Sequence, residues 1–158
     1  MKLFIWKQLP VPTPEMLEPH TSFITPRVLE LVYTAIDMAP LARDLGDTGV
    51  PFCWDEDRRF QLRAELDAYF LHLYGISRED ADYVLETFQS ASGGGLKNNE
   101  IAKYGHYRTK SLVLAEFDRV AAVGVSFDTP LVDGERFSSS LTPRPGHGPR
   151  HPVSRPVG

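Results

Sequence analysis

The stretch from Tyr69 to Phe88 reads YFLHLYGISREDADYVLETF, and it predicts two helices that meet at a sharp corner. Apolar residues on both sides of the corner recur every three or four positions, as they do in amphipathic helices. Gly75 suits the left-handed cap that ends a helix. Ser77, with Asp80 three residues later, resembles the capping box that begins the next one. The corner therefore joins two consecutive helices of a mainly α-helical protein.

The first helix of this pair is expected over about 55–74, because acidic residues at its start suit the positive end of the helix dipole. The second is expected over 78–88, with Ala81, Val84, Leu85 and Phe88 facing inward. Another helix is predicted to begin at Thr25-Pro26, a typical cap followed by proline. A last helix is predicted at about 107–122. The intervening 90–100 segment, SASGGGLKNNE, contains three consecutive glycines and is predicted to be a mobile connection.

The two ends of the chain differ from this helical centre. Residues 1–22 combine a short apolar run, Leu3–Trp6, with a proline-rich arm, and the run is expected to form a short strand or an extended arm. Residues 23–124 form the predicted helical domain, a small bundle of about four helices. Residues 125–158 are rich in proline, glycine and serine, and disorder is expected from Phe137 onward.

Length, charge and cysteine content limit the possible classes of protein. The chain has 158 residues, enough for one domain, and a net charge of −4. This charge argues against autonomous, non-specific DNA binding, which depends on neutralising phosphates. Cys53 is the only cysteine, so no disulfide forms within the chain. The sequence shows neither a signal peptide nor an apolar run of the roughly 18 residues that a membrane span needs, so a cytoplasmic protein without membrane partners is expected.

The segment KYGHYRTK, residues 103–110, is the main candidate for a binding surface. Its cations could contact phosphates, and its rings could stack on bases. The alternative is a solvated helix start whose tyrosines pack under the preceding helices. A second candidate binding segment, Lys7-Gln8, lies near the N-terminus and could contact DNA. The alternative interpretation is that these two residues form only a polar turn. The candidate DNA-binding residues are Lys103, Tyr104, His106, Tyr107, Arg108 and Lys110 in the first segment, and Lys7 and Gln8 in the second.

No catalytic or metal-binding set can be assembled from the sequence. The acidic run Asp55–Asp57 is typical of a helix start, and no lysine follows it in a nuclease-like arrangement. The five histidines have no metal-ligand spacing with one another or with Cys53. The glycines at 93–95 lack the preceding strand and the spacing of a phosphate-binding loop. No catalytic residue and no metal site are therefore predicted.

Several segments, in order, resemble the C-terminal region of the large adenine-specific DNA methyltransferases of restriction–modification and phage-defence systems, including the type IIG-like enzymes. The resemblance covers about residues 3–123. The segments that carry it are Phe4–Pro10, Arg63–Ala68, Leu73–Ser77, Asp82–Leu85, Thr87-Phe88, Tyr104-Gly105 and Tyr107–Lys110. In that family the methyltransferase domain lies upstream, and the C-terminal region belongs to or adjoins the part that recognises DNA.

The resemblance implies a non-catalytic part that helps to position DNA, in a fragment or split subunit whose partners are DNA and a methyltransferase catalytic domain. The chain lacks the Asn-Pro-Pro-Tyr/Phe motif that holds the target adenine and the glycine-rich turn for S-adenosylmethionine. No cofactor is therefore expected in this chain, although S-adenosylmethionine serves the parent family. The alternative is a helical protein-interaction module that docks on a methyltransferase or another defence-system partner. An autonomous enzyme is the least favoured interpretation.

Overall fold

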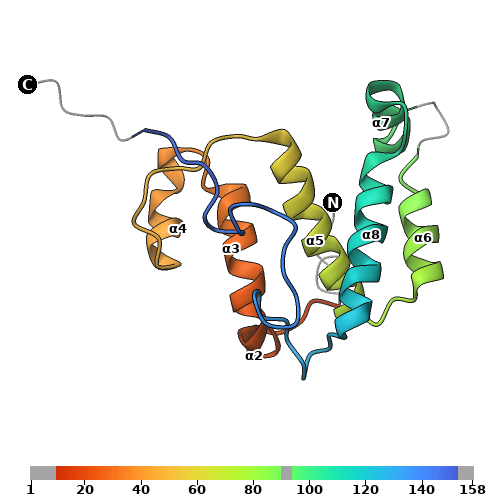
Figure 1. Ribbon diagram of the computed structural model, residues 1–158, viewed down its shortest axis with the longest axis horizontal. Helices are drawn as coiled ribbons and strands as arrows, with labels where there is room; N and C mark the ends of the chain where they lie inside the picture. The colour runs from red at the N-terminus through yellow and green to blue at the C-terminus, as the bar shows by residue number, and fades with distance from the viewer. Residues whose placement is uncertain (1–9, 90–93, 153–158) are drawn as a thin grey trace, which may run out of the picture.

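The computed structural model describes residues 10–89 and 94–152, and it confirms the mainly helical fold (Figure 1). Within these ranges no β-strand forms, and only isolated bridges occur. The strand or arm predicted at Leu3–Trp6 lies outside the described residues. The helical elements are α2 (Pro14–Leu17), the 3-10 turn η1 (Glu18–His20), α3 (Thr21–Val32), η2 (Ile36–Met38), α4 (Ala39–Asp44), α5 (Glu56–Leu73), α6 (Arg78–Glu86), α7 (Leu96–Tyr104) and α8 (Arg108–Val123).

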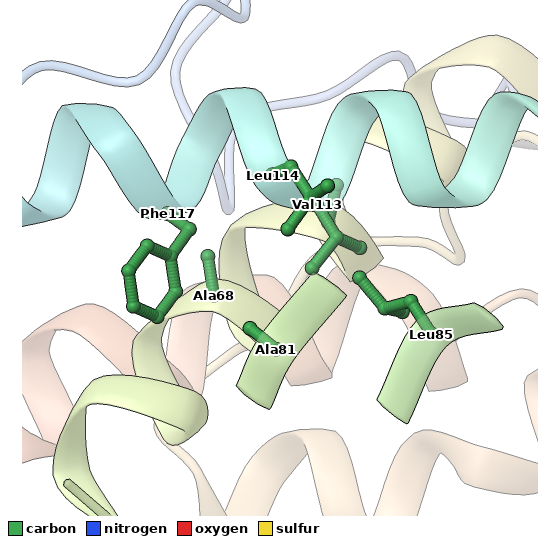
Figure 2. Close-up of a cluster of buried hydrophobic side chains, with 7 residues drawn as sticks. Ala68, Ala81, Leu85, Val113, Leu114 and Phe117 are labelled. Atoms are coloured by element: carbon green, nitrogen blue, oxygen red, sulfur yellow. The ribbon is translucent and has the colours of Figure 1, made fainter. Parts of the chain in front are cut away.

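The centre of the fold is a layer of three helices in which α8 packs against both α5 and α6 (Figure 1). Small residues of α5 and α6, among them Ala68 and Ala81, let the helices approach closely. Val113 and Phe117 of α8 fill the space between them (Figure 2). Burial of these apolar side chains is the main stabilising contribution to this part of the protein.

The predicted corner between α5 and α6 is confirmed together with its caps. The Asp55 side chain accepts a hydrogen bond of 3.0 Å from the Arg58 amide at the start of α5. Gly75 follows α5 with a φ of +66°, a conformation that favours glycine. The Ser77 hydroxyl accepts a 3.0 Å hydrogen bond from the Asp80 amide and donates to the Asp80 carboxylate at 2.9 Å. This reciprocal contact resembles a capping box.

The start of α3 differs from the prediction. The helix begins at Thr21 rather than at Thr25-Pro26, and Pro26 lies inside it. Phe23, in the first turn, is fully buried and stacks on Tyr69 with ring centroids 4.2 Å apart. This burial outweighs the unfavourable effect of a proline inside a helix, which is why the helix extends past the local sequence signal.

The predicted mobile connection contains a helix that the sequence did not reveal. Residues 96–100 of this predicted connection belong to α7, and Gly105 caps the end of α7 with a φ of +78°. Glu100 of α7 is buried, and its carboxylate accepts a 2.7 Å hydrogen bond from the Thr109 amide in the first turn of α8. A side chain of one helix thus caps the next, and this contact orders the end of the connection.

The C-terminal segment also differs from the prediction of disorder beyond Phe137. The described part, residues 125–152, runs back along α3 and α5 (Figure 1). Leu131 and Phe137 are buried in a cluster with Phe23 and Tyr69. Farther along, an antiparallel bridge joins Arg150 to Phe52. These contacts compensate for the cost of ordering a segment whose composition is typical of disorder.

Candidate functional site

The structure divides the predicted basic and aromatic edge between two neighbouring helices. Tyr107 is buried, and its hydroxyl donates a 3.1 Å hydrogen bond to the carbonyl of Leu85 in α6. Tyr104 is half-buried and meets Phe60 of α5 edge to face, with ring centroids 6.0 Å apart. Both tyrosines therefore pack against the helical core. This agrees with the alternative interpretation of the segment, in which its tyrosines pack under the preceding helices.

Two of the cations in the edge form ion pairs within the protein. Arg108 lies 2.7 Å from the Asp57 carboxylate and stacks over Phe60, with its guanidinium 4.2 Å from the ring centroid. Lys110 contacts two acids of α6, Asp82 at 2.9 Å and Glu86 at 2.8 Å. Each cation is thus close to a negative charge, which reduces the positive potential that the edge presents to a phosphate.

Glu86 shows the electrostatic consequence of this arrangement. Hydrogen bonds from Lys110 and then Lys97 lower the pKa of its carboxyl from 4.5 to about 2. These side chains join α6, the start of α7 and the start of α8. The contacts are well placed to hold the three helix ends together.

Lys103 and His106 are the exposed members of the edge. The Lys103 ammonium lies over the Tyr104 ring, 4.8 Å from its centroid. His106 has a ring nitrogen 3.1 Å from the Tyr104 carbonyl oxygen. The structure therefore gathers Lys103, Tyr104 and Arg108 near the start of α5, while Tyr107 and Lys110 turn toward α6. Lys7 and Gln8 lie outside the described residues.

An apolar groove runs between α5 and α6, and α8 forms its floor. We define it by eight lining residues and a volume of about 260 Å³. Val84 of α6 and Phe88, two residues beyond the end of α6, were predicted to face inward from one helix, yet they are 41% and 50% exposed. They form one wall of the groove rather than part of the closed core. The lining residues are Asp67, Phe70, Leu71, Tyr74, Val84, Leu85, Phe88 and Val113.

Among the residues that the structure describes, Asp67 is the only charged one in the lining of this groove. Asp67 is exposed by its accessible surface, yet desolvation by the protein atoms around it raises the pKa of its carboxyl, an effect that Arg63 partly opposes. A cation placed beside this carboxylate would stabilise its charged form, because that form is incompletely solvated here. Sequence analysis did not single out Asp67 as a groove residue, because no local pattern distinguishes it from an ordinary acid on a helix surface.

Tyr74 lies at the opposite end of the α5 wall from Asp67. Its hydroxyl donates a 2.8 Å hydrogen bond to the carbonyl of Pro10. This contact fixes the beginning of the described chain at the rim of the groove.

A second, more polar hollow of about 360 Å³ adjoins Asp67 on its other side. Phe60 contributes an aromatic surface, and both acids and bases line the rest. The charged lining residues are Glu56, Arg63, Asp67, Glu100 and Lys103. Because Asp67 lines both hollows, it marks the boundary between an apolar and a polar part of the same α5 surface.

The described residues contain neither a metal-ligand cluster nor a helix suited to a membrane. In 10–89 and 94–152, no three His, Cys, Asp or Glu side chains gather as ligands for a metal ion. No helix in that part of the chain combines the length and apolar character needed to cross a membrane. Comparisons with protein families, curated proteins and solved structures gave no match for this chain.

Proposed function

We propose that this chain is a non-catalytic, helical protein-interaction module that docks on a partner through the apolar groove. The observation that carries the proposal is the open apolar wall formed by Val84 and Phe88 beside the carboxylate of Asp67. Apolar side chains that line an open groove are typical of surfaces that bind a polypeptide segment.

The groove indicates the chemistry of the partner segment. Its volume of about 260 Å³ is smaller than the roughly 300–1,000 Å³ of pockets that bind drug-sized ligands. It suits a few bulky apolar side chains, and Asp67 favours a lysine or arginine among them. Following the family resemblance, the proposed partner is the catalytic part of an adenine-specific DNA methyltransferase.

A DNA-positioning role is the second candidate, and the exposed Lys103 and His106 favour it. Three observations weigh against it as the main role. The chain carries a net charge of −4, and both Arg108 and Lys110 are engaged with carboxylates. DNA affinity grows with the number of phosphates that free cations neutralise, so this edge has little to contribute.

Two binding measurements on the full chain test the proposal. A purified adenine methyltransferase that lacks its own C-terminal region should bind the chain in calorimetry. Val84→Arg, which places a charge in the groove, should abolish that binding. Tyr83→Arg is the matched control, because Tyr83 is 71% exposed and does not line the groove. Equal binding by both variants would contradict docking through the groove.

Duplex DNA provides the second measurement. We expect weak anisotropy changes at low salt and none at physiological salt. An affinity that falls steeply with salt and weakens in Lys103→Ala would favour the DNA-positioning role instead.

A further inference from the structure

We infer that the side of α5 that lines both hollows binds the same surface of a second copy of this chain, which gives a symmetric dimer in the absence of another partner. The inference goes beyond the proposed function, because it concerns the chain on its own. A partner segment in the apolar groove would compete with the second copy.

The residues of α5 that line the two hollows form one stripe along the helix. They recur alternately four and three residues apart, which is the spacing with which a helix faces another helix in a coiled coil. The first and the last are 18 residues apart, which corresponds to about 27 Å of helix. The stripe therefore has the form of a helix-pairing surface. Its members in this spacing are Glu56, Phe60, Arg63, Asp67, Phe70 and Tyr74.

The charged residues in the middle of the stripe are accessible to a partner. Arg63 and Asp67 are both exposed, and the Arg63 side chain is 50% exposed. One aromatic residue flanks this pair on each side along the stripe: Phe60 lines the polar hollow, and half-buried Phe70 lines the apolar groove. The centre of the stripe thus offers both charges between two aromatic side chains.

The stripe is complementary to itself about a two-fold axis. In a symmetric dimer the same surface patch meets itself, and each contact occurs twice. An axis midway between Arg63 and Asp67, perpendicular to α5, makes the two helices antiparallel. The alternating spacing stays in register, because it reads the same in both directions. Arg63 then faces Asp67 of the second copy, and Phe60 faces Phe70 of the second copy.

Charge complementarity selects this antiparallel arrangement. Two parallel copies of the stripe would place Arg63 opposite Arg63 and Asp67 opposite Asp67, and like charges at such positions repel. The antiparallel pair instead forms two ion pairs and two aromatic contacts. The second copy therefore supplies both the apolar contact and the cation that the surface around Asp67 favours.

Charge reversal in the full chain, followed by sedimentation velocity, tests the inference. The parent protein should be a dimer that dissociates on dilution. Arg63→Glu and Asp67→Arg should each weaken dimerisation by at least about ten-fold, because both ion pairs become repulsive. Arg43→Glu and Glu79→Arg make the same charge changes at exposed positions outside the stripe, and they should leave the dissociation constant unchanged.

A mixture of the two charge-reversed chains is the more specific measurement. One chain then carries only acids and the other only bases at the two positions, so the mixture should form a heterodimer. The chain with both substitutions should dimerise like the parent, because its ion pairs are merely exchanged. Such a restoration reports direct coupling between the two positions. It also requires folded chains, so it separates lost dimerisation from unfolding.

Three outcomes would overturn the inference: a monomeric parent at the highest soluble concentration, a dimer that neither charge reversal weakens, or charge-reversed chains that fail to associate when mixed. None of these measurements uses a methyltransferase. A failed dimer assay therefore leaves the calorimetric test of partner docking intact, and a failed partner assay leaves the dimer intact.

Discussion

Arg27 and Glu65 form a salt bridge of 2.8 Å in which neither side chain is exposed to solvent. Arg27 comes from α3 and Glu65 from the middle of α5, so the pair joins the two halves of the helical domain. The same guanidinium contacts Asp133 at 2.7 Å and donates to the carbonyl of Phe23. One arginine therefore links α3, α5 and the C-terminal segment.

Removal of this arginine should strongly destabilise the protein. Arg27→Met leaves the Glu65 carboxylate buried without its cation, and breaking a buried pair in this way costs about 3–5 kcal/mol. Urea unfolding at neutral pH measures the loss. Arg78→Met is the control, since its 2.9 Å pair with Asp118 is exposed and is expected to contribute less than about 1 kcal/mol. Similar losses in the two variants would contradict a special role for the buried pair.

The hydroxyl of Tyr69 should hold the C-terminal segment in place. It lies 2.7 Å from Nδ1 of buried His20 and accepts a 3.3 Å hydrogen bond from the Leu131 amide. Nε2 of His20 lies 3.2 Å from the Phe127 carbonyl, which can only accept, so in the neutral imidazole Nε2 carries the proton and Nδ1 accepts from the tyrosine.

Tyr69→Phe should therefore leave Nδ1 of His20 and the Leu131 amide without a partner, at a cost of about 1–3 kcal/mol. Hydrogen exchange measures the effect directly, and the Leu131 amide should exchange faster. Tyr83→Phe on the exposed face of α6 should leave that rate unchanged. Unaltered protection of Leu131 in the Tyr69 variant would show that the segment is held by other contacts.

The parts of the fold that follow from neighbouring residues could be predicted from the sequence. Gly75 and Ser77 specify the corner between α5 and α6 through their own conformation and hydrogen bonds. Burial of Leu131 and Phe137 could not be predicted in this way. Their partners, Phe23 and Tyr69, lie far away in the sequence, and the composition around them is that of a disordered tail.

The candidate site, too, has parts that follow from local sequence and parts that depend on how the helices pack. The residue types of the segment 103–110 predicted a basic surface. The acids that pair with two cations of this segment come from α5 and α6, so the sequence alone did not reveal them. The groove depends on how far α5 and α6 stand apart, which no local pattern encodes. Val84 and Phe88 followed the helical spacing of core residues, and only the packing of the helices shows that they remain open.

Gly148 should tolerate no side chain. A Cβ at this position would fall on the carboxylate of Glu30, which forms a buried salt bridge with Arg58. Gly148→Ala should push the two segments apart and cost about 1–3 kcal/mol, the usual range for overpacking. Ser140→Ala, at an exposed position of the same segment, should change the free energy of unfolding by less than about 0.5 kcal/mol. Equal stability of the two variants in urea would contradict the close approach.

The final prediction concerns the acid end of the stability profile. The pKa of Glu86 is lowered from 4.5 to about 2 by Lys110 and Lys97. Because the folded-state pKa is the lower one, the stabilisation from this carboxylate is complete above about pH 4.5 and is lost as the pH falls toward about 2. A carboxyl NMR titration of Glu86 should therefore show a midpoint near 2 in the parent protein.

The variant that combines Lys97→Met with Lys110→Met should move this midpoint up toward 4.5. The loss of stability on acidification should then become shallower between these two pH values, because folded and unfolded states bind protons alike. Arg78→Met, which removes a neighbouring cation without touching Glu86, serves as the control. A midpoint unchanged by removing both lysines would mean that they do not lower the pKa of Glu86, and their proposed role in joining the ends of α6, α7 and α8 would lose its electrostatic basis.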